Sequence, residues 1–373
     1  MPRICVATTV HPPFDARIFY KEARALAETG YSVTLLAPHT RNETVDRVRI
    51  VALRPFKSRL GRILLSPGTV FWKALRERPG VLHVHDPELL LAGVCLGLLT
   101  RTKVIYDVHE DYPRLILVKH WLPRFARRLI AGAVGCAERV SAHLLDGIVV
   151  VTETIQARFP AKKTVLVRNF PSLDLVEQSS PRESDPSAPR LIYVGGLSRS
   201  RGLFEMTEAL SLLDRRWNAR LMLVGAFEGS ATESELRATR GYDRVDLVGS
   251  VPYKRIPSYF RGSSVGLVCL HPGGGHETAL PVKLFEYMAA GLPVIASRFP
   301  LWERIVRECR CGLSVDPLDP EEISAAIRYL IDHPEEARRM GQNGREAVRE
   351  KYNWEAEATR LVELYARLLA GEA

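Results

Sequence analysis

The amino-acid sequence predicts an α/β protein built from two Rossmann-like domains. Short apolar runs alternate with helical patterns through the first half of the chain, and the same alternation restarts near residue 190. Between the two halves, residues 171–189 are rich in serine, proline and acidic residues, as an interdomain linker would be. At 373 residues the chain is long enough for two full hydrophobic cores.

Strands in the first half are predicted where apolar residues run without interruption, which is typical of parallel strands covered on both faces. The expected strands are Ile4–Val10, Val33–Ala37, Arg49–Leu53, Leu82–His85, Lys103–Val108, Ile148–Val151 and Thr164–Val167. Strands alternating with helical segments indicate a doubly wound domain.

The connection after the first strand reads HPPFDARIFYKEARALAETG and is expected to be helical up to Gly30. Prolines replace the glycine-rich turn of a dinucleotide fold, and no GxGxxG is present, so a nicotinamide or flavin site is not expected. Two interpretations of Asp15 stay open. It either caps the helix that contains Ile18 and Leu26, or it contacts a ligand.

Two basic amphipathic segments follow, KSRLGRILLSPGTVFWKALRER after Phe56 and PRLILVKHWLPRFARRLIAG from Pro113. Residues 1–172 carry a net charge of +12, whereas residues 173–373 carry −3. The apolar side of each segment either packs on the sheet or lies on an anionic membrane surface. The charge asymmetry makes membrane docking a hypothesis worth testing.

Polar residues gather where two strands should end, His83 and His85 in LHVHDPE and His109 in VIYDVHEDYP. Ligands of α/β sheets collect at the carboxyl ends of strands. These strand-end residues therefore favour a functional interpretation, whereas His83 is expected to be a core histidine with its hydrogen bonds satisfied.

In the second half, RLIYVGGLSRSRGLFEMTEAL predicts a strand, a glycine turn and a helix from about Leu203. Further strands are expected at Leu221–Val224, Val245–Val248, Val265–Leu270 and Val294–Ala296. The last helix, YNWEAEATRLVELYARLL, places Trp354, Leu361, Leu364 and Leu368 at helical spacing.

The stretch from His271 to Ser297 joins a Gly273–Gly275 loop to a helix expected to begin at Pro281 and to stop at Gly291. Lys283 and Glu286 share one face near the helix N-terminus, where free N–H groups and the helix dipole attract anions. A ligand with phosphate and hydroxyl groups would suit this arrangement. The alternative is a surface ion pair beside a flexible loop.

Several classes of protein are disfavoured by what the sequence lacks. The six cysteines show no CxxC spacing, so neither a zinc site nor a disulfide framework is expected. No Asp-x-Asp motif occurs, and we expect no metal site. No nucleic-acid module is recognisable. No signal peptide or membrane span is apparent, and we expect a cytoplasmic protein that is peripheral at most at the inner face of the membrane.

The segment LFEYMAAGLPVIAS resembles the donor-binding signature of GT-B glycosyltransferases, especially the retaining family 4. The resemblance implies two Rossmann-like domains facing across a cleft, with Glu286 binding the ribose of a sugar nucleotide. The first glutamate of the usual pair should fall at Thr278, but the carboxylate here is Glu277, one place early. The turn VGGLSRSRG is similar to the family's diphosphate turn, with Gly196 where an arginine is usual. The loop GSVPYKRIP is similar to the base-binding segment, around Val251 and Pro252.

The resemblance also assigns roles and boundaries. The implied catalytic residues are His109, Glu277, Lys283, Arg201 and Asp15, with His11 and Arg17 as further candidates for ligand contacts. The implied donor-binding residues are Gly195, Gly196, Arg199, Arg201, Val251, Gly274, Gly275, Lys283, Leu284 and Glu286. The implied domains are an acceptor domain at 1–172, a linker at 173–189, a sugar-nucleotide domain at 190–350, and a helix at 351–373 that crosses back to the first domain.

The activity implied is transfer of a sugar from a nucleoside-diphosphate sugar to a hydroxyl acceptor, which could be lipid-linked or a precursor of a cell-surface glycan. No cofactor is expected, a UDP-sugar is favoured over GDP- or dTDP-sugars, and the transfer is expected to proceed with retention and without metal. Two alternatives stay open. One is an inverting transferase of the lipid-linked oligosaccharide type, which the DARIFYKEARAL segment also resembles, and the other is a GT-B sugar-nucleotide epimerase.

Overall fold

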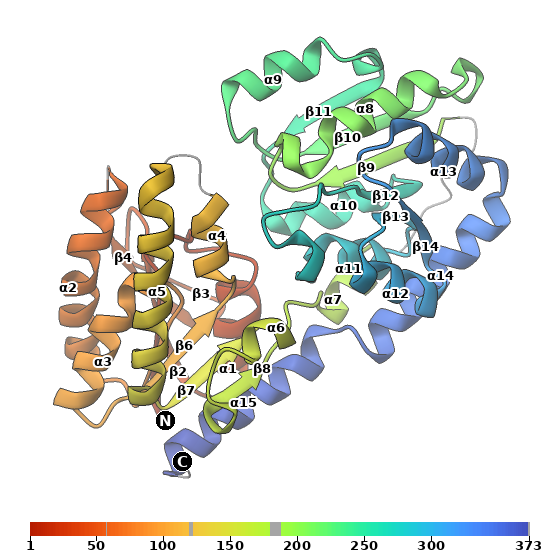
Figure 1. The fold of residues 1–373 in the computed structure, drawn as a ribbon. Coiled ribbons are helices and arrows are strands. Elements are labelled where there is room, and N and C mark those ends of the chain that lie inside the picture. The colour runs from red at the N-terminus through yellow and green to blue at the C-terminus, as the bar shows by residue number, and fades with distance from the viewer. Residues whose placement is uncertain (57, 119–121, 180–187, 372–373) are drawn as a thin grey trace. The chain divides into compact units, whose positions relative to one another are not determined.

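The computed structural model describes residues 1–56, 58–118, 122–179 and 188–371. The chain forms two compact units, one of Met1–Asn169 with Glu355–Ala373 and one of Phe170–Trp354 (Figure 1). Each unit holds its own sheet and its own core of buried aliphatic and aromatic side chains.

The sheet of the first unit has eight strands in the order β3-β4-β2-β1-β5-β6-β7-β8. All neighbours are parallel except β3, which pairs antiparallel with β4 at the edge. The strands are β1 (Arg3–Ala7), β2 (Ser32–Pro38), β3 (Glu43–Val45), β4 (Val48–Leu53), β5 (Val81–Val84), β6 (Lys103–Val108), β7 (Gly147–Val150) and β8 (Thr164–Leu166). The seven predicted strands are confirmed as elements, whereas β3 was not predicted.

Helices cover both faces of this sheet (Figure 1). They are α1 (Arg24–Glu28), α2 (Arg59–Glu77), α3 (Leu90–Leu99), α4 (Tyr112–Val118), α5 (Arg124–Leu144), α6 (Glu153–Gln156) and α15 (Trp354–Ala370). A π-helical turn, Ile18–Ala23, precedes α1. The C-terminal α15 packs on the first unit, where Leu364 and Leu368 lie against Gly147, and Leu361 and Tyr365 are fully buried.

The second unit has a parallel six-stranded sheet in the order β11-β10-β9-β12-β13-β14. The strands are β9 (Arg190–Val194), β10 (Arg220–Val224), β11 (Val245–Gly249), β12 (Val265–Val268), β13 (Val294–Ser297) and β14 (Gly312–Val315). The helices are α7 (Leu173–Gln178), α8 (Leu203–Leu212), α9 (Ser230–Arg237), α10 (Ile256–Phe260), α11 (Val282–Ala289), α12 (Pro300–Cys309), α13 (Pro320–Asp332) and α14 (Pro334–Glu350). The edge strand β14 was not predicted.

Two glycines allow the turns after β9 and β10 to approach their neighbours closely. A Cβ on Gly202 would lie 1.9 Å from the carbonyl oxygen of Cys269, and one on Gly225 would lie 1.8 Å from that of Gly195. Both residues have positive φ, 74° and 155°. Only glycine fits such positions without strain, and it brings the turn after β9 next to the loop after β12.

The predicted linker is partly folded. Residues 173–178 form α7, which buries Leu175 and Val176 in the core of the second unit, so this part is not a linker. Residues 180–187 lie outside the described part of the chain. In the part that is described, no helix combines the length and the apolar character that crossing a bilayer requires.

Candidate active site

One group of candidate residues lies in the second unit, where a glycine loop leads into α11. Gly273, Gly274 and Gly275 all have positive φ, at 103°, 65° and 90°, a run that side-chain-bearing residues would not adopt. Helix α11 begins at Val282, with Pro281 as its N-cap, one residue later than predicted. Gly291 ends it at φ 73°, as predicted.

Lys283, in the first turn of α11, reaches back to the turn after β9. Its Nζ donates a hydrogen bond to the Tyr193 hydroxyl at 3.1 Å and lies 4.6 Å from the centre of that ring. Gly195 leaves room for it, because a Cβ there would lie 3.1 Å from Nζ. Burial, and then the nearby Arg201 charge, lower the pKa of Lys283 to about 7, although Glu286 and Glu228 partly oppose this. Burial and the second cation thus outweigh the two carboxylates in setting the pKa of Lys283.

This pKa predicts that the binding of an anionic ligand is linked to proton uptake. A diphosphate bound beside Lys283 would favour its ammonium form, so binding of a diphosphate ligand should take up close to one proton at pH 8 and almost none at pH 5.5. Affinity should fall up to about tenfold per pH unit above pH 7. Calorimetry in buffers of different ionisation enthalpy measures the uptake, and Lys283→Met should abolish it. Equal uptake at both pH values would contradict the assignment.

Glu286 lies on the same helix and is 7% exposed. Its Oε1 accepts a hydrogen bond from the Tyr253 hydroxyl at 3.2 Å. Tyr253 begins the short helical turn Tyr253–Arg255, directly after Val251 and Pro252. The predicted base-binding segment and the predicted ribose ligand are therefore in direct contact.

The two predicted phosphate-binding arginines differ in their surroundings. Arg199 is exposed, pairs with Glu235 at 2.8 Å and stacks on Phe204, so its guanidinium is already bound to other groups. Arg201 is half-buried, and its charge acts on Lys283, Tyr193 and His276. Among the described residues, no carboxylate forms an ion pair with Arg201. Of the two predicted residues, Arg201 is therefore the one less engaged by other side chains.

Three other predicted residues have local roles. Glu277 accepts the Gly273 N–H at 2.8 Å and so shapes the loop. Leu284 is fully buried, and its N–H bonds to the Pro281 carbonyl. Gly196 is surrounded closely, since a Cβ there would lie 2.6 Å from Glu228 Oε1. Gly274 and Gly275 keep open space around them, as a ligand-facing loop requires.

In the first unit, His11, Asp15 and His109 lie together. The rings of His11 and His109 stack with centroids 5.6 Å apart, and His11 Nδ1 lies 3.3 Å from Asp15 Oδ2. Asp15 Oδ1 accepts the N–H groups of Arg17 and Ile18, so the capping interpretation is confirmed. Burial opposes ionisation of Asp15, but His11 and these N–H donors lower its pKa to about 2.

Arg17 is not a ligand contact, because it is 3% exposed and is bound inside the first unit. Its Nε lies 2.7 Å from Glu22 Oε1, its Nη2 lies 2.9 Å from Asp107 Oδ2, and its Nη1 donates to the Val167 carbonyl. Burial opposes the charge on Asp107, yet Arg17 holds the pKa of that carboxyl well below its usual range. Burial and the Asp107 charge raise the pKa of Glu22 well above its usual range.

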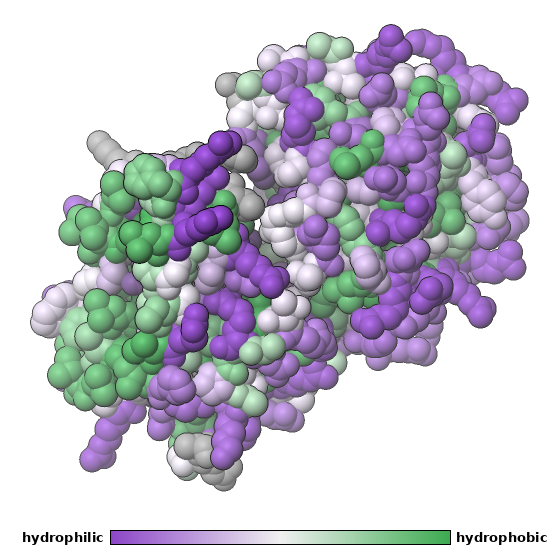
Figure 2. Space-filling model, viewed as in Figure 1, coloured by the Kyte–Doolittle hydropathy of each residue, from purple (hydrophilic) through white to green (hydrophobic). Residues whose placement is uncertain are grey.

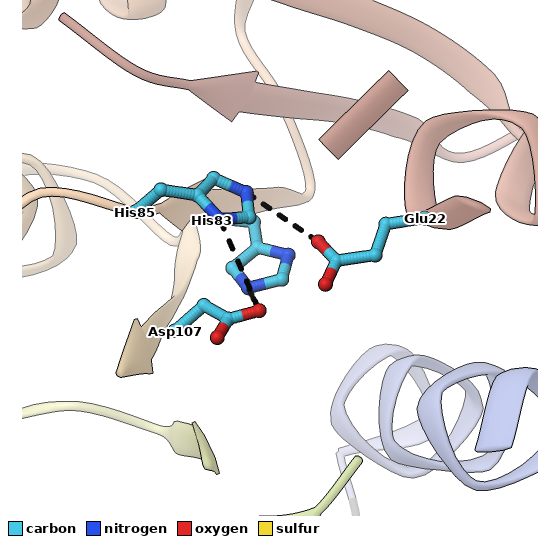
Figure 3. Close-up of side chains that lie close together, drawn as sticks. All are labelled: Glu22, His83, His85 and Asp107. Atoms are coloured by element: carbon cyan, nitrogen blue, oxygen red, sulfur yellow. Dashed lines mark ion pairs between the residues drawn. The ribbon is translucent and has the colours of Figure 1, made fainter. Parts of the chain in front are cut away.

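His83 and His85 complete this buried group (Figure 3). His83 Nδ1 bonds to the Tyr365 hydroxyl at 2.8 Å, but its Nε2 has no hydrogen-bond partner among the described residues. The expectation of a fully satisfied core histidine was therefore wrong for one of its two nitrogens. His85 Nδ1 lies 2.8 Å from His109 Nε2, which ties His109 to the group.

Sequence reasoning missed Tyr193, Tyr253 and Glu22 as members of these sites. Tyr193 lies within an apolar strand and Tyr253 in a turn, and nothing in their spacing points to Lys283 or Glu286. Asp107 lies in the segment VIYDVHEDYP, whose strand-end polar residues were given a functional interpretation, but its contacts with Arg17 and Glu22 were not predicted.

Comparison with known proteins agrees with this geometry. The family model described as "Glycosyltransferase Family 4" matches residues 16–168, and "Glycosyl transferases group 1" matches residues 177–347. A glycogen synthase of Mycobacterium tuberculosis is 21% identical, with 99% of this chain and 96% of that protein aligned.

Solved structures show the same fold. Sucrose-phosphate synthase from Thermosynechococcus elongatus has a TM-score of 0.80 at 21% identity and covers 100% of both chains. Anabaena Alr3699/HepE in complex with UDP-glucose has a TM-score of 0.72 at 14% identity, over 98% of this chain and 99% of that one. Matched by two glycosyltransferase models over both of its halves, the chain belongs to the GT-B glycosyltransferases.

Proposed function

We propose that the enzyme transfers a sugar from a nucleoside-diphosphate sugar, preferentially a UDP-sugar, to a hydroxyl acceptor. The proposal rests on two neighbouring cations, Lys283 and Arg201, beside the glycine loop. Glu286 lies one turn further along α11. This set offers cations to a diphosphate and a carboxylate to the ribose hydroxyls. The solved relative that holds UDP-glucose supports the choice of donor.

In the proposed chemistry, preorganised positive groups stabilise the negative charge that develops on the leaving diphosphate. As the bond from the anomeric carbon to the diphosphate oxygen breaks, negative charge grows on that oxygen. Lys283, Arg201 and the N–H groups at the start of α11 stabilise this charge more in the transition state than in the ground state. We propose that these groups replace a divalent cation at the diphosphate, and that the transfer proceeds with retention.

A thermal-shift screen over UDP-, GDP- and dTDP-sugars tests this proposal when it is run with and without EDTA. A ligand that binds the folded state raises the apparent melting temperature by mass action. We expect UDP-sugars to give the largest shift and EDTA to leave it unchanged. The absence of a shift with every nucleotide sugar would overturn the proposal. A shift that appears only with added magnesium would overturn the metal-free diphosphate site.

Glu286→Gln should weaken donor binding more than it slows turnover. A charged acceptor that binds hydroxyls contributes about 1.5–3 kcal/mol, so KM for the donor should rise about 10- to 100-fold, while kcat falls much less. Glu208→Gln, on exposed α8 surface, is the matched control and should match the wild type. Unchanged KM in Glu286→Gln would remove this residue from the donor site.

We also propose that the first unit docks on an anionic lipid surface, which would bring the enzyme to a lipid-linked acceptor. On α2, the residues that face inward are Ser66, Val70 and Ala74, whereas Leu64 and Trp72 are 74% and 61% exposed. On α5, Phe125 is 88% exposed. Apolar residues gather over α2, α3 and α5 on the face that Figure 2 shows. Packing on the sheet does not account for them.

Basic side chains border this apolar surface. Arg124, Arg128 and Arg139 are exposed on α5. A cavity of about 580 Å³ beside α4 and α5 is lined by Arg128 and Arg139, by Arg114 and Arg158, and by Leu117. Guanidinium groups next to exposed aromatic and aliphatic side chains suit phosphate headgroups above acyl chains.

Vesicle binding should therefore depend on charge and on α5. The protein should cosediment with vesicles rich in phosphatidylglycerol at low salt, and binding should weaken as salt shortens the Debye length. Exchanging Phe125 and Leu129 together for serine should reduce binding about tenfold, because both side chains are exposed and would insert. Leu318→Ser, exposed in the second unit, is the control. Equal binding to neutral vesicles would contradict electrostatic docking.

A further inference from the structure

The buried group in the first unit has the composition of a metal site. Glu22, His83, His85 and Asp107 each offer one donor atom, and these four atoms all lie within 4.8 Å of one another (Figure 3). The residues come from the π-helical turn, from β5 and its end, and from β6. All four side chains are fully buried.

The Nε2 atoms of the two histidines face carboxylate oxygens without hydrogen-bonding to them. Glu22 Oε2 lies 3.5 Å from His85 Nε2, and His83 Nε2 lies 3.7 Å from Asp107 Oδ2, both beyond an ordinary hydrogen bond. Glu22 Oε2, His83 Nε2 and His85 Nε2 have no hydrogen-bond partner among the described residues. Unpartnered polar atoms are costly in a core, and here three of them converge.

The outer nitrogens of both imidazoles are held as those of metal ligands are. His83 Nδ1 can donate to the Tyr365 hydroxyl, and His85 Nδ1 can donate to His109 Nε2, each across 2.8 Å. Donation through Nδ1 leaves the Nε2 lone pair directed inward, which is the usual arrangement of a metal-ligating histidine. Arg17 binds both carboxylates from the other side and fixes their orientation.

We infer that Glu22, His83, His85 and Asp107 bind a divalent transition metal, Zn²⁺ by the chemistry of the donors. Two of the separations between donor atoms, 3.5 and 3.7 Å, match edges of a tetrahedron whose centre lies about 2.1–2.3 Å from its corners, close to zinc–nitrogen and zinc–oxygen bond lengths. The other separations are no longer than 4.8 Å. A water molecule has two hydrogens and would leave one of the three unpartnered acceptors unmet, whereas a cation can be bound by all four donor atoms.

The site would be structural and distinct from the diphosphate site, which lies in the second unit. It would join the π-helical turn to β5 and β6, and through Tyr365 it would anchor α15. Through His85 it would also fix the ring of His109. The inference thus goes beyond the proposed transfer reaction, which needs no metal at the diphosphate.

Metal analysis of the untagged, full-length protein tests the inference. Protein from cells grown with Zn²⁺ or Co²⁺ should carry about one ion per chain after gel filtration in a chelator-treated buffer. The Co²⁺ form should show the visible absorption of four-coordinate Co²⁺ with nitrogen and oxygen donors. The spectrum should lack thiolate charge-transfer bands. Their presence would mean that the ion is bound by one of the six cysteines.

Variants separate this site from adventitious binding. His85→Gln and Glu22→Gln should each lower the metal content at least tenfold, whereas His143→Gln, exposed on α5, should retain it. The Co²⁺ spectrum of the wild type keeps the test decisive if a variant fails to fold. Less than about 0.1 ion per wild-type chain, thiolate bands, or variants that keep their metal would each overturn the inference. The group would then be held by a proton shared between Glu22 and Asp107.

Discussion

Lys283→Met should lower kcat about 10²- to 10³-fold while raising the thermal stability of the protein. The loss of turnover follows from removing a cation that faces the developing charge of the diphosphate, for which deletions of single preorganised groups give losses of this size. Because the charge matters most as the bond breaks, kcat should fall more than donor affinity does.

The gain in stability follows from the position of the ammonium group in the ligand-free protein. Its pKa of about 7 lies below the ordinary value of 10.5, so folding disfavours the charged form. Between these two values the unfolded state binds more protons, and the cost of folding this group is greatest below pH 7. Methionine fills similar space without the charge. Because water partly screens the charge, we expect the free energy of unfolding to rise by about 1–2 kcal/mol, which would raise Tm by roughly 2–6 °C.

The combination of effects distinguishes a functional lysine from a structural one. Replacing a residue that is needed for folding would lower both Tm and kcat. For Lys283→Met we expect Tm to rise and kcat to fall. Lys351→Met, an exposed lysine after α14, is the control and should change neither. Calorimetry at pH 6 measures Tm, and a transfer assay on the same protein preparations measures kcat. Wild-type kcat in Lys283→Met would remove the diphosphate site from α11.

The sequence predicted most of the fold because apolar runs and glycine turns are local signals. The strands it missed, β3 and β14, are edge strands of three and four residues, and most of their residues are only partly buried. The start of α11 and its end at Gly291 were predicted within one residue, because proline and glycine act through their own backbone preferences.

The sites were predicted less completely, because their contacts span large separations along the chain. Lys283 and Glu286 share a helix face and could be paired from spacing alone. Their partners Tyr193 and Tyr253 lie 90 and 33 residues away, and no local pattern links them. Similarly, Arg17 was predicted to be a candidate for ligand contacts, yet it pairs with Asp107, 90 residues away along the chain, in a core.

His109→Gln should lower kcat about 10²-fold and leave the stereochemistry of the product unchanged. Glutamine can still accept a hydrogen bond from His85, so the buried group stays intact and the loss of kcat reports a role of His109 in the transfer step. Binding of UDP-glucose to the second unit should change little. A wild-type kcat in this variant would show that His109 does not touch the reacting groups.

Retention is the outcome that the surroundings of Asp15 favour. An inverting transfer needs a general base opposite the leaving group, and a carboxylate with a pKa of about 2 is a weak one. One oxygen of Asp15 already accepts two backbone N–H groups, and the other faces His11. We therefore expect the leaving diphosphate to take the proton of the incoming hydroxyl, and Asp15→Asn to cost less than tenfold in kcat. Proton NMR of the product decides the matter, because an anomeric configuration opposite to that of the donor would exclude retention. Abolished turnover in Asp15→Asn with donor binding intact would then identify Asp15 as the base.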